Sequence, residues 1–189
     1  MLKQIKIITV SKGLIMKNDF KFCPNCASKN ITNTNNRKWE CGDCGFVLYN
    51  NSATAVGVII VNKAGQILME VRAKEPKFGM LDVPGGFVEH GETAEVACVR
   101  ECREELGVEI KDLKYLCSFP NTYEYKNIQY KTCDMFFIAK IADDAKFKLQ
   151  ADEVSNIKWC DLKNKQDLYN LPLAFDSAYN ALAFYLVTV

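Results

Sequence analysis

The chain has 189 residues, of which 49% are hydrophobic and 25% charged, a composition typical of one globular domain with a small appendage. Its formal net charge is +1, so no general positive field is available to hold a nucleic acid. No apolar run is long enough to span a membrane. Lys12 interrupts the apolar residues near the start, so we expect neither a membrane anchor nor a secretion signal.

Residues 1–20 are interpreted as an N-terminal extension, and residues 21–48 contain few aliphatic side chains. The second segment holds two Cys-x-x-Cys pairs, formed by Cys23, Cys26, Cys41 and Cys44. Four thiolates from two tight turns match the tetrahedral site of structural zinc. A redox dithiol is the alternative, but it needs a strand-helix context that this segment lacks. We therefore expect a zinc ribbon over residues 21–48. The remaining cysteines are scattered singly, which indicates a cytoplasmic protein without disulfides.

The sequence becomes rich in strand-like runs after residue 52. Two of them, "ATAVGVIIV" and "GQILMEVRA", are joined by "NKAG" and predict a hairpin. Further strands are expected over 113–120, 128–141 and 155–162, and helices over 93–106 and 177–186. Strands with few helices between them predict an α/β (α+β) fold in which a mixed sheet is flanked by helices.

The helix expected over residues 93–106 concentrates carboxylates on one narrow face, formed by Glu101, Glu104 and Glu105. The other side carries Val96, Val99, Cys102 and Leu106, which we expect to pack on the sheet. Like charges at this spacing repel, so the cluster is explained if a divalent cation binds there, and oxygen ligands suit Mg²⁺ or Mn²⁺. Arg100 can pair with Glu104, four residues on. A solvated charged face is the alternative.

The segment "LDVPGGFVEHGE" precedes this helix and places a Pro-Gly-Gly turn ahead of it. Glycine lets the backbone approach a ligand, and a carbonyl there could join a metal's ligands. The spacing from Gly86 to Glu92, through Arg100-Glu101 and Glu104-Glu105 to Gly107-Val108, resembles the signature of the Nudix hydrolases. Cys102 departs from it, standing where a larger aliphatic residue is usual.

The resemblance implies an α/β/α sandwich that hydrolyses a nucleoside diphosphate linked to another moiety with Mg²⁺ or Mn²⁺. It implies that Glu101, Glu104 and Glu105 bind the metal, that Gly86 offers its carbonyl, and that Glu92 and Arg100 orient the glutamates. A glutamate must accept the proton of the attacking water. Glu101 and Glu153 are both candidates for this base, and an ordinary loop acid is the alternative for Glu153.

A zinc ribbon followed by a Nudix domain over residues 52–189 resembles the NADH pyrophosphatases and the ADP-ribose/FAD pyrophosphatases. The expected partner is a small nucleotide, with ADP-ribose, NADH or FAD ahead of others, and neither nucleic acid nor membrane. Tyr123 and Tyr125 could stack on a nucleobase, or simply form sheet faces. Three alternatives stay open: a nucleotide-binding sensor, a hydrolase of oxidised nucleoside triphosphates, and one acting on a nucleotide cap of RNA. A homodimer is compatible with the sequence.

Overall fold

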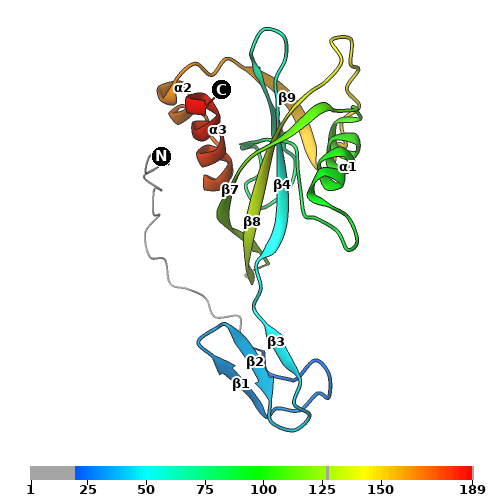
Figure 1. The fold of residues 1–189 in the computed structure, drawn as a ribbon, viewed down its shortest axis with the longest axis vertical. Coiled ribbons are helices and arrows are strands. Elements are labelled where there is room, and N and C mark those ends of the chain that lie inside the picture. Colours follow the sequence, from blue (N-terminus) through cyan, green and yellow to red (C-terminus); the bar gives the residue numbers. More distant parts are fainter. Residues whose placement is uncertain (1–19, 127, 189) are drawn as a thin grey trace.

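The computed structural model describes residues 20–126 and 128–188, so the expected N-terminal extension lies outside the described residues except for Phe20. A small antiparallel sheet lies at one end of the molecule (Figure 1). Its strands, in spatial order, are β1 (Ile31–Thr34), β2 (Lys38–Cys41) and β3 (Val47–Tyr49). Trp39 is buried in this unit, with the ring of Phe20 edge-on to it at 4.9 Å.

Two three-stranded sheets form the larger part of the molecule. In the first, β4 (Ala53–Ile60) pairs in parallel with β8 (Ile128–Lys140), which pairs antiparallel with β7 (Lys111–Tyr125). In the second, β5 (Ile67–Arg72) lies between β6 (Leu81–Asp82) and β9 (Val154–Cys160), antiparallel to both. Parallel and antiparallel pairs occur together, as the expected mixed sheet requires.

Helices cover both sides of these strands, with α1 (Ala94–Leu106) on one side and α2 (Lys165–Tyr169) and α3 (Asp176–Thr188) on the other (Figure 1). Successive strand residues point to opposite faces, so each side has its own core. Phe137 packs in the α1 cluster with Leu106, whereas its neighbour Phe136 packs in the α3 cluster with Leu182. The expected α/β/α sandwich is confirmed. No helix in residues 20–126 or 128–188 is long and apolar enough to cross a bilayer.

The local chemistry of α1 explains its ends. The hydroxyl of Thr93 accepts a hydrogen bond from the amide of Val96 at 3.3 Å and caps the first turn. Gly107 ends the helix with φ of 69°, a left-handed conformation that glycine adopts without strain. The helix expected over residues 93–106 is therefore confirmed.

Three expectations need correction. The predicted hairpin is wrong, because the two strands meet only at the bridge between Val61 and Ile67 and then enter different sheets. Val96 does not pack on the sheet but is 53% exposed, and the buried side of α1 contains Ala97 and Cys98 instead. The last helix is longer at both ends than residues 177–186, and the short α2 was not predicted.

The Pro-Gly-Gly turn packs directly against β4. Gly85 has φ of 155°, and a Cβ atom built on it would lie 2.0 Å from the carbonyl oxygen of Val56. The Val58 amide donates to the Pro84 carbonyl at 2.8 Å, which holds the turn at this distance. Only glycine fits at position 85, because the obstacle is backbone that cannot rotate away.

We expect Gly85→Ala to lower the free energy of unfolding by at least about 2 kcal/mol, since the new methyl group must displace β4. Gly65→Ala is the matched control. Gly65 also has a positive φ, of 78°, but its Cβ would meet open space, so its cost should be only about 1 kcal/mol. Urea denaturation of both variants measures the difference, and equal losses would contradict the close-packing argument.

Candidate active site

The turn after β6 and the carboxylates of α1 are in direct contact. The Gly85 amide donates a hydrogen bond to Oε2 of Glu105 at 2.9 Å. The Glu101 carboxylate lies against Gly86, where an added Cβ would be 2.3 Å from Oε1. The Gly86 carbonyl accepts a hydrogen bond from Val56 at 2.8 Å and keeps a second lone pair. Because neither glycine carries a side chain, the carboxylates of Glu105 and Glu101 can lie directly against the backbone of the turn.

Arg100 organises the carboxylates at the surface of α1. Its guanidinium donates to Glu92 at 2.7 and 3.2 Å, to Glu101 at 2.8 Å and to Glu104 at 3.0 Å. A further bond of 2.9 Å reaches the carbonyl of Phe87. The planar, five-donor guanidinium can hold several acceptors in fixed directions. The predicted pair with Glu104 is present, and Arg100 also joins the helix to the loop before it.

The three glutamates of α1 differ in burial. Glu101 and Glu105 are buried, whereas the Glu104 side chain is 52% exposed. Burial raises the pKa of Glu101, although Arg100 opposes the shift. Burial raises the pKa of Glu105 well above its ordinary value, against the Gly85 hydrogen bond and with the help of the charges of Glu101 and Glu153. The helix therefore presents two buried carboxylates that are costly to ionise, and one carboxylate that is exposed to solvent.

A further acid, Glu70 of β5, lies in the same electrostatic environment. It is 4% exposed, and its Oε1 atom has no hydrogen-bond partner among the described residues. Burial raises the pKa of Glu70 well above its ordinary value, and the charge of Glu105 raises it further. Glu70 was not predicted from the sequence, although an acid within the apolar run "ILMEV" is a signal that could have found it.

Glu153 lies in the turn before β9, close enough for its charge to raise the pKa of both Glu101 and Glu105. Its carboxylate pairs with Lys74 at 2.5 Å. Its backbone carbonyl accepts from Ala73 at 2.7 Å, which fixes the turn against the end of β5. The structure thus brings this late acid near the α1 carboxylates, as the interpretation of Glu153 as a candidate base requires.

These residues suit a divalent cation. Hard cations such as Mg²⁺ and Mn²⁺ take carboxylate and carbonyl oxygens, and Glu101, Glu104, Glu105 and the Gly86 carbonyl offer that donor set. The raised pKa values of Glu101 and Glu105 show that ionising these side chains is costly in this environment. A positive charge bound between them would offset that cost. The carboxylates are not themselves gathered to within 4.8 Å; among the described residues, only the four cysteines form such a group.

The two candidate tyrosines lie on the opposite side of the turn. Tyr123 contacts the ring of Phe87 at 5.7 Å and that of Phe175 at 5.9 Å. It lines a cavity of about 90 Å³ beside Gly85 and Gly86, and a neighbouring hollow of about 400 Å³. Tyr125 lines the outer hollow but not the cavity beside the glycines, and it is 43% exposed. Of the two, Tyr123 is therefore the one next to the turn.

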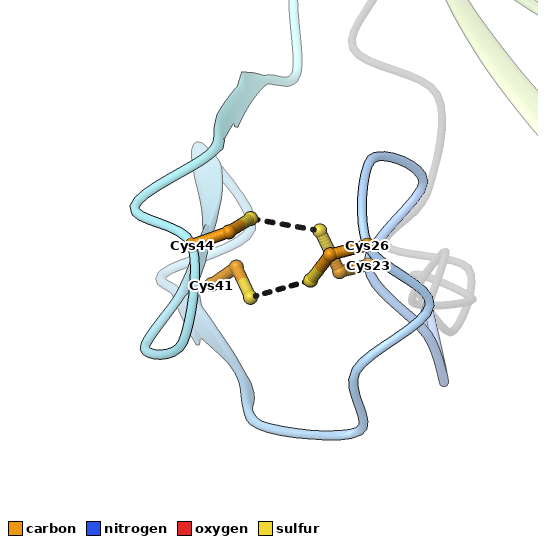
Figure 2. A group of neighbouring side chains, drawn as sticks. All are labelled: Cys23, Cys26, Cys41 and Cys44. Atoms are coloured by element: carbon orange, nitrogen blue, oxygen red, sulfur yellow. Dashed lines mark hydrogen bonds between the residues drawn. The ribbon is translucent and has the colours of Figure 1, made fainter.

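The four paired cysteines come together in the small sheet's unit. Cys23 and Cys26 lie on one loop and face Cys41 and Cys44 on the other (Figure 2). The Sγ atoms of Cys23 and Cys44 are 3.7 Å apart, and those of Cys26 and Cys41 are 3.6 Å apart. The amide of Asn25 and the backbone at Phe46 lower the pKa of Cys44 to about 6. Although the hydrogen bond with the backbone at Ser28 opposes the shift, the pKa of Cys26 is raised to about 12 by its hydrogen bond with Cys44 and by burial, so Cys44 is the thiolate of this pair. All nine cysteines are free, so no disulfide competes for these sulfurs.

Comparisons with known proteins agree with this geometry. The NUDIX domain model matches residues 51–176. The NAD-capped RNA hydrolase NudC of Vibrio parahaemolyticus is 31% identical over 152 residues, which cover 78% of this chain and 54% of that protein. The chain thus spans about half the length of the curated relatives it matches.

Solved structures give the same fold. A MutT NUDIX hydrolase from Burkholderia pseudomallei is 26% identical with a TM-score of 0.57, over 73% of this chain and 99% of that one. A NUDIX hydrolase from Nitrosomonas europaea is 22% identical with a TM-score of 0.64, over 89% and 91% of the two chains, and its likeness concerns the fold alone. Because the matched segment holds the glycine turn, Arg100 and the α1 glutamates, the chain belongs to the NUDIX family.

Proposed function

We propose that the protein hydrolyses the diphosphate of a nucleoside diphosphate linked to another moiety, with NAD-type dinucleotides, ADP-ribose and FAD as the substrate class. One observation carries the proposal: Glu101 and Glu105 are buried against the Gly85–Gly86 backbone while Arg100 holds the surrounding carboxylates. Similarity to proteins named NAD-capped RNA hydrolases favours the NAD-type substrate.

We assign roles to this chain's residues as follows. Glu101, Glu104, Glu105 and the Gly86 carbonyl would hold Mg²⁺ or Mn²⁺. The ion would neutralise the diphosphate oxygens and make the attacking water more acidic. Arg100, itself tied to Glu92, positions Glu101 and Glu104. Glu101 and Glu153 remain the two candidates to accept the water's proton, and Glu153 also pairs with Lys74.

A nucleotide cap of RNA is the second candidate substrate, and the names of the relatives favour it. The net charge of +1 gives it no general electrostatic support. A binding-only sensor is less favoured because every charged position of the signature is filled. Oxidised nucleoside triphosphates are the remaining alternative substrate and serve as a comparison in the screen below.

The experiment that tests the proposal is a hydrolysis screen with Mg²⁺ over NADH, ADP-ribose, FAD, oxidised nucleoside triphosphates and NAD-capped RNA. We expect the dinucleotides and ADP-ribose to be cleaved, and Glu105→Gln to reduce kcat by roughly 10²–10⁴-fold, or about 3–5 kcal/mol. The carboxylate's charge matters most when charge builds on the phosphate oxygens, so kcat should fall more than substrate affinity.

Glu109→Gln is the matched control, because it removes the same charge just beyond α1. Glu109 is exposed and pairs with Arg103 at 2.8 Å, away from the turn, so turnover should be unchanged. Near-normal turnover by Glu105→Gln would contradict the catalytic assignment. Turnover of oxidised triphosphates alone would contradict the substrate class.

The raised pKa of Glu105 also predicts a pH dependence of stability. The folded chain holds a proton that the unfolded chain releases above about pH 4.5, so without Mg²⁺ the free energy of unfolding should fall as pH rises through the folded pKa. Glu105→Gln should flatten this decline, and saturating Mg²⁺ should reverse it because the ion binds the ionised form. Urea midpoints of the wild-type protein and of Glu105→Gln, measured across the pH range, show how steeply the stability of each changes with pH. Identical slopes would disprove the raised pKa of Glu105.

We propose that residues 21–48 form a zinc ribbon and residues 52–189 the hydrolase domain, in a cytoplasmic protein. Zinc with Zn–S bonds of about 2.3 Å and tetrahedral geometry needs sulfurs about 3.8 Å apart. The observed 3.6 and 3.7 Å support this assignment. Four sulfurs leave no open position, so the zinc would be structural. Homodimerisation stays a prediction.

We expect one Zn²⁺ per chain, and we expect a chelator to unfold residues 21–48 before the hydrolase domain, since thiolate ligation is coupled to local folding. Elemental analysis and amide exchange measure these effects. Cys26→Ser should abolish zinc binding, whereas Cys133→Ser, also at an exposed cysteine but outside the cluster, should leave it intact. Zinc-free protein, or a Cys23–Cys26 disulfide, would refute the assignment.

A further inference from the structure

One cation near the candidate active site has no role in the hydrolytic assignment: Lys74, in the loop that follows β5. Its Nζ atom pairs with Oε1 of Glu153 at 2.5 Å. The two side chains are 45% and 30% exposed, so the pair lies at the surface without being fully solvated. Within residues 20–126 and 128–188, neither side chain has a second hydrogen bond or ion pair. The position of the Glu153 carboxylate therefore depends on Lys74.

The backbone of Glu153 is held from two sides. Its carbonyl accepts a hydrogen bond from the Ala73 amide at 2.7 Å, and its amide donates to the Gln150 carbonyl at 2.9 Å. The Gln150 amide in turn donates to the Glu105 carbonyl at 3.0 Å. These bonds tie the turn both to the end of β5 and to the last turn of α1. Because the backbone is fixed, only the side-chain rotamer decides where the Glu153 carboxylate lies.

The loop that carries Lys74 closes on the end of β5. The Arg72 amide donates to the Met80 carbonyl at 3.0 Å, and the Gly79 amide donates to the Arg72 carbonyl at 2.9 Å. Lys74 lies at the start of this closed loop, directly after the residue whose amide holds the Glu153 carbonyl. Two neighbouring residues thus hold the backbone and the carboxylate of the same acid.

The other cation of the site, Arg100, does not hold Glu153. In the described part of the chain, its side-chain hydrogen bonds go to α1 and to the loop before α1. Glu153 nevertheless lies close to the helix, because its charge contributes to the raised pKa of both Glu101 and Glu105. The acids are therefore divided between two cations, with Arg100 on the helix acids and Lys74 on the late acid.

We propose that Lys74 is a positioning residue for the proton acceptor of the reaction. Its ammonium holds Oε1 of Glu153, and Oε2 remains to accept the proton of the attacking water. A carboxylate on a flexible side chain must meet that water at one point, and a misplacement of about 1 Å can cost roughly 10²-fold in rate. The inference rests on the proposed function, in which Glu153 is one of two candidate acceptors.

Two other roles for Lys74 would give different kinetics. An ordinary surface ion pair contributes little, so its loss would change neither kcat nor KM. A direct contact with the substrate would chiefly raise KM, and Lys74 does line the outer hollow of about 400 Å³ together with Phe87. A residue that acts by holding Glu153 lowers kcat instead, since the substrate still binds but its proton acceptor is misplaced.

The first test removes the ammonium and uses the substrate that the screen finds to be cleaved fastest. We expect Lys74→Met to lower kcat by about 10-fold while KM changes by less than about 3-fold. Lys74→Arg keeps the positive charge and should recover kcat to within about 3-fold of wild type. Lys77→Met is the matched control, because Lys77 is an exposed lysine of the same loop with no partner in the described part of the chain. Wild-type kcat in Lys74→Met, or equal losses in Lys74→Met and Lys77→Met, overturns the proposal.

The second test asks whether Lys74 acts through Glu153. Glu153→Gln should lower kcat by about 10²-fold or more, the usual contribution of a proton acceptor. The double variant with Lys74→Met should turn over as fast as Glu153→Gln alone, because the residue through which Lys74 acts is already disabled. A further loss of about 10-fold in the double variant would show that Lys74 acts independently, and normal turnover by Glu153→Gln would leave it nothing to position. Either result overturns the proposal.

Equilibrium binding of Mn²⁺ separates this inference from the hydrolytic one, since it needs no turnover. Without the ammonium, the Glu153 carboxylate is free to approach an ion on α1, so calorimetry should find Mn²⁺ bound about 3-fold or more tightly by Lys74→Met than by wild type. In a Glu153→Gln background, Lys74→Met should bring no such gain, because glutamine supplies no charge. This pattern without hydrolysis of any substrate would uphold the role of Lys74 and contradict the proposed function. Hydrolysis by the wild-type chain, with kcat and Mn²⁺ affinity unchanged in Lys74→Met, would do the reverse.

Discussion

The rest of the site depends on the close approach of the Gly85–Gly86 backbone to α1. The Gly85 amide holds Glu105, and the bare Cα of Gly86 admits the carboxylate of Glu101. On its other side, the same turn packs on the backbone of β4, so it is fixed from two directions. A side chain at Gly85 would push the turn away from β4, and one at Gly86 would displace the Glu101 carboxylate.

The buried acids around this turn lower the stability of the fold unless a positive charge lies close to them. Burial raises the pKa of Glu70, Glu101 and Glu105 together, and each charge opposes the next. A chain selected only for stability would place apolar residues at such positions. Arg100 compensates part of the cluster from the surface. The remaining repulsion is the physical argument that the carboxylates serve chemistry rather than packing.

Sequence alone predicted the parts of the molecule that local chemistry controls. Thr93 and Gly107 determine the ends of α1, and both can be identified from the chain. The partners of β4 could not be predicted, because a tight turn such as that at Asn62 is compatible with either pairing or divergence. The burial of Val96 was predicted wrongly for a different reason. The position of the sheet decides which side of α1 is buried, and that side includes Glu101 and Glu105. Arg72 and Asp134, which line the same cavity, lie far apart in the chain, so their proximity could not be predicted from the sequence.

Residues 50–52 alone connect β3 to β4. The four peptide units from Tyr49 to Ala53 can extend over at most about 14 Å. The lining of the cavity begins at Ala55, only two residues into β4. A molecule held by the small N-terminal sheet would therefore stay in the neighbourhood of the cavity mouth, at an effective concentration in the millimolar range typical of short connections. Even weak binding by the small sheet would then increase the overall affinity for a long substrate substantially.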